Sequence, residues 1–170
     1  MNPSTQSHRC LAMAMLCLIL SACSAPRPDL APCKILQQSS RCVAVPMHDD
    51  PHEEQAKSLQ RPEEGFSYVY VARPYAQQRS VATEVYVDGK HVTTLGPMTF
   101  ARLKVKNGRH LIRISTAGVG DKSVEARIES NVYLQYQLIE QFFSVKSQLE
   151  TPSPEKAFQM IAPLDLVLSD

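Results

Sequence analysis

The sequence predicts an all-β fold, mainly antiparallel, that forms either a β-sandwich or a partly open barrel. Two observations predict it. After residue 65 the chain holds about seven short segments rich in β-branched and aromatic residues, several of which alternate with polar residues. Turns containing Gly, Pro or Asn separate these segments at the short intervals that are typical of sandwiches and small barrels.

The amino terminus predicts a signal peptide over residues 1–22. Met1–Cys10 is polar and carries one cation, Arg9, whereas Leu11–Leu20 is apolar and uncharged. Such a run is too short to cross a bilayer as a helix, which takes about 20 residues. A short apolar run between a positive start and small residues is typical of a secretory signal that is removed from the mature protein.

The end of this segment, Leu20-Ser21-Ala22-Cys23, resembles the lipobox of bacterial lipoproteins. The resemblance implies cleavage before Cys23 and covalent attachment of lipid to its sulfur. More than one acyl chain is needed for a stable membrane anchor. Ser24 resembles the signal that sends lipoproteins to the outer membrane, so the expected location is the periplasmic face of that membrane.

Composition narrows the possible partners of the 170-residue chain. Loss of the signal would also remove Arg9, which leaves equal numbers of basic and acidic residues. Balanced charge argues against a nucleic-acid-binding protein. The length fits one domain after the signal. We find no second apolar run long enough to span a membrane, and no cofactor motif.

Two of the five cysteines, Cys33 and Cys42, would remain unmodified in the mature chain. An even pair in an oxidising compartment predicts a disulfide. The chain-entropy model gives roughly 2.5–3 kcal/mol for closing a loop of about ten residues. A metal site is the alternative, but the spacing of the pair lacks the short C-x-x-C pattern of zinc sites.

Residues 23–61 are expected to form a tether between the lipid and a β-domain over residues 62–170. Ser24–Leu30 is rich in Pro and small residues. Further along, His48–Glu54 combines two histidines with four carboxylates, which would suit a metal ion. Because Pro51 and the many charges favour a mobile, solvated segment, an acidic linker is the preferred interpretation.

The first strands of the domain have clear signals. Phe66–Arg73 is apolar on both faces, which predicts a central strand covered on both sides. Val81–Val87 and His91–Leu95 flank Asp88-Gly89, a dipeptide that favours a two-residue hairpin.

Later elements follow the same reasoning. Met98–Lys106 and Arg109–Thr116 flank Asn107-Gly108, which predicts a second hairpin. Two further strands are expected at Lys122–Glu129 and, as one long strand, at Val132–Phe143. The last elements expected are a short helix within Glu155–Ile161 and a final strand at Leu164–Leu168.

Three of these pieces occur in a familiar order: Tyr68–Arg73, Val87-Asp88-Gly89-Lys90 and Asn107-Gly108-Arg109-His110. Their order and spacing resemble the bacterial lipoprotein family catalogued as domain of unknown function 2846. The resemblance covers about residues 62–145. It implies a β-sandwich in an envelope lipoprotein and does not imply any catalytic residues.

The predicted Asn107-Gly108 hairpin would gather five cations on one face of the sheet. These cations are Arg102, Lys104, Lys106, Arg109 and Arg113. Such a face would suit an anionic partner, such as lipopolysaccharide, phospholipid headgroups, peptidoglycan carboxylates or an acidic envelope protein. The alternative is an ordinary solvated face, on which Glu125 would lie opposite Arg113 and Glu129 opposite Arg109.

The motifs of common enzymes are not found in the sequence. It has no G-x-S-x-G elbow, no H-E-x-x-H pair and no phosphate-binding loop. His91 is expected to be exposed, and His110 is expected to lie opposite Val105 as a hydrogen-bonded residue at the core edge. The predicted function is therefore non-catalytic binding or scaffolding in the periplasm, without cofactors. The alternative is a metal-binding or hydrolytic accessory lipoprotein that uses His48–Glu54.

Overall fold

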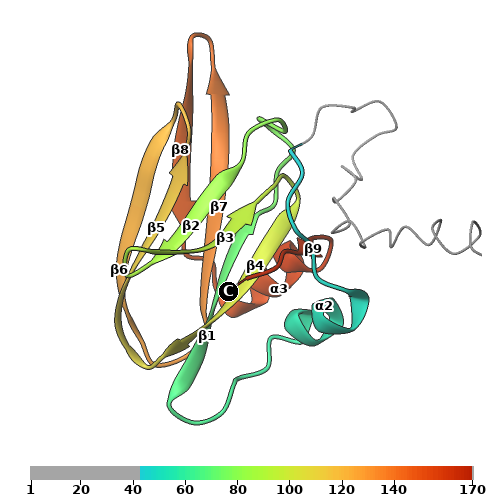
Figure 1. The fold of residues 1–170 in the computed structure, drawn as a ribbon, viewed down its shortest axis with the longest axis vertical. Coiled ribbons are helices and arrows are strands. Elements are labelled where there is room, and N and C mark those ends of the chain that lie inside the picture. The colour runs from blue at the N-terminus through green and yellow to red at the C-terminus, as the bar shows by residue number, and fades with distance from the viewer. Residues whose placement is uncertain (1–42, 170) are drawn as a thin grey trace, which may run out of the picture.

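The computed structural model describes residues 43–169 and shows two β-sheets packed face to face (Figure 1). One sheet has five strands in the order β8-β7-β1-β4-β9, and the other has four in the order β3-β2-β5-β6. The predicted all-β fold is confirmed as a sandwich and not a closed barrel. The signal peptide, Cys23 and the Cys33–Cys42 pair lie outside the described residues and stay predictions.

The helices and strands alternate with short connections along the described chain. Their bounds are α2 Asp50–Lys57, β1 Phe66–Arg73, β2 Thr83–Val87, β3 Lys90–Leu95, β4 Thr99–Lys106, β5 Gly108–Thr116, β6 Gly120–Ile128, β7 Val132–Gln141, β8 Ser144–Glu150, α3 Pro154–Ile161 and β9 Asp165–Leu166. Among residues 43–169, no helix has the length and apolar composition that a membrane crossing requires.

The main hydrophobic core lies between the two sheets. Alternation along each strand directs every second side chain into it. Val69, Val71 and Leu103 enter from the five-stranded sheet, and Ile112 and Ile114 enter from the other sheet; all are at most 4% exposed. Full burial of an aliphatic side chain of this size contributes about 1.5–3 kcal/mol, so this layer is a major source of stability.

A second apolar layer covers the outer face of the five-stranded sheet. Tyr70 and Phe100 point outward from β1 and β4, where they are buried with Ala56 of α2 and with Ala157 and Ile161 of α3. The Tyr70 hydroxyl donates a hydrogen bond to the Ala56 carbonyl at 3.2 Å. The prediction that Phe66–Arg73 is a central strand covered on both sides is therefore confirmed.

The acidic segment before this layer is a helix, so the interpretation of His48–Glu54 as a mobile linker is wrong. Asp49 caps α2 by accepting a hydrogen bond from the His52 backbone N–H. Pro51 stands in the first turn, where its missing N–H leaves no intrahelical bond unmade. Val45 is 1% exposed and Ala56 is fully buried, so the packed domain includes residues 43–61 as well as 62–169.

The two predicted hairpins have different outcomes. Asp88 and Gly89 both adopt positive φ, and Val87 pairs with Lys90, so the β2–β3 hairpin is confirmed. The β4–β5 hairpin is wrong, because β4 and β5 belong to different sheets. Asn107 instead donates its N–H to the Gly65 carbonyl at 2.8 Å, and its side chain accepts from Ser67 at 2.8 Å. These bonds hold Asn107 to β1 while the chain crosses to the other sheet.

The predicted strand Val132–Phe143 is two residues too long. It ends at Gln141, turns at Phe142 and Phe143, and returns as β8, which the sequence analysis missed. No Gly, Pro, Asn or Asp marks this turn, so its sequence lacks the usual signal. The predicted helix near the end and the final strand are present as α3 and as β9, which is parallel to β4.

Candidate functional site

A groove lies on the outer face of the five-stranded sheet, where β1, β4 and β9 meet the segment that leads into α2. Its volume is about 290 Å³, and its lining residues are His48, Tyr68, Arg102, Lys104, Leu166 and Ser169. The backbone N–H of His48 donates to the Leu166 carbonyl at 2.9 Å, which fixes the segment against β9. The groove joins two candidates from the sequence, the histidine-rich segment and part of the basic face.

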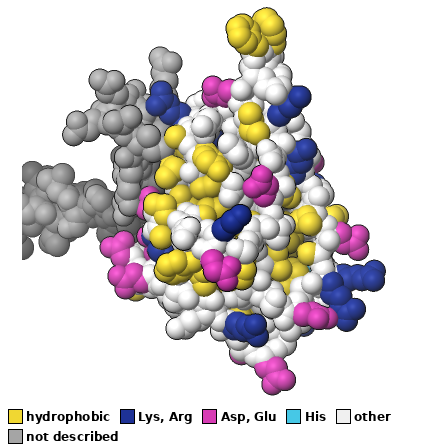
Figure 2. Space-filling view, turned by 180° about the vertical axis from the view of Figure 1, so that it is seen from behind, with side chains coloured by type: hydrophobic (Ala, Val, Ile, Leu, Met, Phe, Trp, Pro, Cys, Tyr) yellow, Lys and Arg dark blue, Asp and Glu magenta, His cyan; other side chains and the backbone are white. Residues whose placement is uncertain are grey.

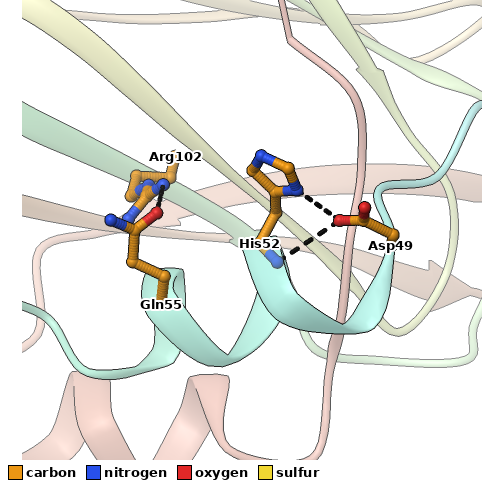
Figure 3. A network of polar contacts seen from close by, with 4 residues as sticks. All are labelled: Asp49, His52, Gln55 and Arg102. Carbon is orange, nitrogen blue, oxygen red and sulfur yellow. Dashed lines mark hydrogen bonds and ion pairs between the residues drawn. The ribbon is translucent and has the colours of Figure 1, made fainter.

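Arg102 contributes the cation nearest to α2. It points outward because its strand neighbours, Ala101 and Leu103, point into the core. Its guanidinium lies over the Tyr68 ring, 4.8 Å from the centroid. It also donates to the Gln55 side-chain oxygen at 3.4 Å, a contact that Figure 3 shows. These partners are neutral, so they position the guanidinium without cancelling its charge.

Lys104 lies two residues further along the same face, and its charge is compensated. Its ammonium group forms an ion pair with Glu63 and lies 4.7 Å from the centroid of the Phe66 ring. The hydrogen bond from Lys104 holds the pKa of the Glu63 carboxyl below its usual value. Arg102 is therefore the stronger candidate for contact with an anion.

His48 stands at the rim of the groove beside His52 and Asp49. The His48 and His52 rings stack with centroids 4.7 Å apart, and the Asp49 carboxylate contacts the Nδ1 atom of His52 (Figure 3 shows Asp49 and His52). Burial and the nearby His52 lower the pKa of His48, and Arg102 adds to this effect against the opposing influence of Asp49. His48 is consequently neutral at physiological pH.

The same three residues meet one geometric requirement of a metal site. One ligand atom from each of His48, Asp49 and His52 lies within 4.8 Å of the other two. Neutral imidazole and carboxylate are common ligands of zinc. At these three residues the Asp49 carboxylate favours a cation and the more weakly acting Arg102 opposes one, whereas in the groove itself the Arg102 guanidinium favours an anion.

The predicted five-residue basic face is divided between the two sheets. Arg102, Lys104 and Lys106 lie on the outer face of the five-stranded sheet, whereas Arg109 and Arg113 lie on the outer face of the four-stranded sheet. This division follows directly from the chain crossing at Asn107. Arg102 and Lys104 alone of these five line the groove.

The prediction that Glu125 lies opposite Arg113 and Glu129 opposite Arg109 is also wrong. Leu111, and not Arg113, lies opposite Glu125 in the β5–β6 ladder, while Arg109 lies opposite Arg127. The Arg113 guanidinium pairs with Asp121 at 3.0 Å and lies 3.8 Å from the centroid of the Tyr86 ring. Glu129 pairs with Arg127 at 2.7 Å.

His110 is a hydrogen-bonded residue at the core edge, as predicted, but its neighbours differ from the predicted ones. It lies opposite Ala126 in the ladder and not opposite Val105. Its Nδ1 lies 2.7 Å from the Asp88 carboxylate and its Nε2 lies 2.7 Å from the Lys106 carbonyl oxygen. Both neighbours are acceptors, so the geometry favours the doubly protonated imidazolium. The pair links the β2–β3 hairpin to the crossing between the sheets.

This pair predicts a pH-dependent stability. Burial lowers the pKa of His110, but the hydrogen bonds to Asp88 and the Lys106 carbonyl outweigh burial and raise it above its usual value. A raised folded pKa gives stability that is present below the unfolded pKa and is lost as pH rises through the folded pKa. The stability contributed by this pair should therefore fall as pH rises above about 6.5, the ordinary pKa of histidine. Denaturation of an Asp88→Asn variant, which keeps an oxygen acceptor for the Leu111 N–H, should show a smaller fall; an equal fall contradicts this role of the pair.

Arg73, the last residue of β1, carries a buried charge that no pattern in the sequence indicates. Arg73 is 1% exposed, and its guanidinium donates to the carbonyls of Gln77, Gln78 and Val81 at 2.5–2.8 Å. Burial lowers its pKa to about 10, so it stays charged at neutral pH. The bonds fix the loop between β1 and β2 and give Arg73 a structural role.

No protein-family model matches the chain. An uncharacterized protein of Haemophilus influenzae (strain Rd) is 25% identical over 131 residues, which cover 76% of this chain and 78% of that protein. The resemblance to domain of unknown function 2846 stays a prediction.

Proposed function

We propose that the chain is a lipid-anchored envelope lipoprotein whose β-sandwich binds an anionic group in the groove beside Arg102, without catalysing a reaction. The anchor rests on the similarity of Leu20–Cys23 to a lipobox. The expected partner is an anionic component of the envelope, such as lipopolysaccharide, peptidoglycan or an acidic protein surface.

The observation that carries the binding role is the guanidinium of Arg102 in a groove, held there by neutral partners. Arg102 contacts the neutral groups of Gln55 and Tyr68, whereas Lys104 on the same strand is paired with Glu63. A guanidinium presents several N–H donors in a plane, an arrangement that matches the oxygens of a carboxylate or phosphate. The groove is large enough for such a group, at about 290 Å³.

A metal-binding accessory role is the second candidate. The observation that favours it is the convergence of one ligand atom each from His48, Asp49 and His52 within 4.8 Å. Zinc bound by three protein ligands keeps an open coordination position, which is the arrangement found in catalytic sites. This role would use α2 and its cap, whereas anion binding would use Arg102 on β4.

The two roles are separated by titrating the full mature protein, purified from the membrane fraction, with inorganic phosphate. Arg102→Gln should weaken phosphate binding roughly tenfold or more, because a hydrogen bond to a charged group contributes about 1.5–3 kcal/mol. Binding is measured from the shift of the backbone N–H signals of Tyr68 and Leu166 in NMR spectra, since the Arg102→Gln variant keeps both of these groove residues. The mass of the peptide that begins at Cys23 shows, in the same preparation, whether lipid is attached.

Arg113→Gln is the matched control, since it removes the same charge from the other sheet. Its affinity for phosphate should stay within about twofold of the unchanged protein, because its partly exposed ion pair contributes little. Equal losses in both variants would indicate general attraction by charge and would contradict the groove. Zinc binding that is lost in His48→Ala but kept in Arg102→Gln would favour the metal-binding role.

A further inference from the structure

The β7–β8 hairpin carries two fully exposed phenylalanines at its tip. Phe142 and Phe143 are 95% and 97% exposed, and their rings pack against each other with centroids 5.6 Å apart. β7 pairs with β1 only as far as Gln135, so the later part of the hairpin extends past β1. Figure 1 shows this hairpin projecting beyond the other strands, and Figure 2 shows hydrophobic side chains at the projecting tip.

The backbone conformation of the turn does not explain why phenylalanine occupies both of its positions. The last ladder pair, Gln141 with Ser144, leaves Phe142 and Phe143 as the whole loop. Turns of this length favour Asn, Asp or Gly, and the other two-residue hairpin uses Asp88-Gly89. Exposed aromatic pairs have a large apolar surface that a partner would bury. Because they stand at a projecting tip, the partner that buries them is expected to be a surface or pocket into which the tip can insert.

The position of the tip relative to Val43, where the described chain begins, suggests which partner buries the two phenylalanines. The N–H of Val43 donates to the Arg79 carbonyl at 2.8 Å, in the loop between β1 and β2. In the same loop, Gln78 donates to the Glu140 carboxylate at 2.9 Å, two residues before Phe142. The chain coming from Cys23 thus reaches the domain at the end that carries the phenylalanines.

We infer that Phe142 and Phe143 insert into the lipid surface to which Cys23 anchors the chain. This inference rests on the proposed lipid anchor. About 20 residues separate Cys23 from Val43, and even a fully extended chain of that length spans at most about 70 Å. The chain between Cys23 and Val43 is therefore long enough for this end of the domain to reach the bilayer. Paired aromatic side chains are suited to the boundary between headgroups and acyl chains.

Charge near the tip makes the expected insertion independent of anionic lipid. Glu140 and Lys146 flank the phenylalanines on β7 and β8 and carry opposite charges. The charges of Glu140 and Lys146 offset each other, so apolar burial is expected to provide the main driving force. Vesicles of neutral phosphatidylcholine should suffice, in contrast to the anion expected at Arg102.

The test uses the absence of tryptophan from the sequence, which makes an introduced tryptophan a unique reporter. The full mature chain with Phe143→Trp is combined with phosphatidylcholine vesicles that carry brominated acyl chains. Its emission should shift to shorter wavelength and lose at least about half of its intensity, because the side chain would sit at the depth of the acyl boundary. Phe158→Trp is the matched control, since Phe158 is 56% exposed on α3, away from the tip, and should not be quenched.

The mass of the peptide that begins at Cys23 is measured on the same samples, so the anchor and the tip are judged separately. Quenching of Phe143→Trp but not of Phe158→Trp supports insertion of the tip, whether or not Cys23 carries lipid. Lipid on Cys23 without quenching of Phe143→Trp would contradict insertion of the tip but would support the lipid anchor. This result is expected if the tip binds a protein pocket instead. Equal quenching of both tryptophans also overturns it.

Discussion

Replacing Arg73 with methionine is expected to lower the free energy of unfolding by about 2–4 kcal/mol. The guanidinium is almost fully buried and donates to three backbone carbonyls, those of Gln77, Gln78 and Val81. Methionine fills much of the same volume but donates no hydrogen bond. Each carbonyl that loses its donor away from water costs about 1–3 kcal/mol, while removal of the buried charge offsets part of this loss.

The effect is measured by chemical denaturation of the unchanged and substituted proteins. Arg127→Met is the matched control, because the Arg127 side chain is 73% exposed and a surface change of this kind is usually within about 0.5 kcal/mol. A loss from Arg73→Met no larger than that of the control would show that the loop between β1 and β2 is held by other contacts.

Removal of residues 1–61 is expected to destabilise the domain by at least about 3 kcal/mol relative to removal of residues 1–42. The longer deletion takes away Val45, which is 1% exposed in the main core, and Ala56, which is fully buried in the second layer. It also removes the bridge between Met47 and Val167. Tyr70, whose hydroxyl bonds to Ala56, would lose the helix that covers it.

Thermal and denaturant unfolding of the two shortened chains would measure this difference. The chain that begins at residue 43 is the control, since it keeps every described contact of α2. Equal midpoints for the two chains would mean that residues 43–61 rest on the sheet without stabilising it, and that the domain begins near residue 62.

The strands show which parts of the fold the local sequence pattern predicts. Phe66–Arg73 was predicted with its observed bounds and with cover on both faces, because its apolar run has no polar face to expose. The β2–β3 hairpin was predicted because Asp88-Gly89 satisfies the positive φ that the turn needs. The phenylalanine turn was missed because neither of its residues has a comparable conformational preference.

The candidate site could be predicted only in part. The residue types were recognised, since Arg102 and Lys104 stood in the basic set and His48 in the metal-binding alternative. Their meeting in one groove could not be predicted, because it depends on α2 covering the outer face of the five-stranded sheet and on β9 pairing alongside β4. A helical interpretation of His48–Glu54 was available from the Asp49 cap and from Pro51 in the first turn.

By itself the sequence determined the all-β class, with a sandwich or a partly open barrel as alternatives, together with most strands and one hairpin, because each follows from short-range periodicity or a turn dipeptide. The lipid anchor is predicted from a contiguous motif. The tertiary structure alone decided that Asn107-Gly108 crosses between sheets, because the side chain and N–H of Asn107 bond to Ser67 of β1 and to Gly65 just before it, about forty positions earlier. That crossing places Arg109 and Arg113 on the far sheet and leaves Arg102 in the groove. A dipeptide sets the preferred dihedral angles of a turn, but hydrogen bonds to distant strands select the sheet in which the next strand lies.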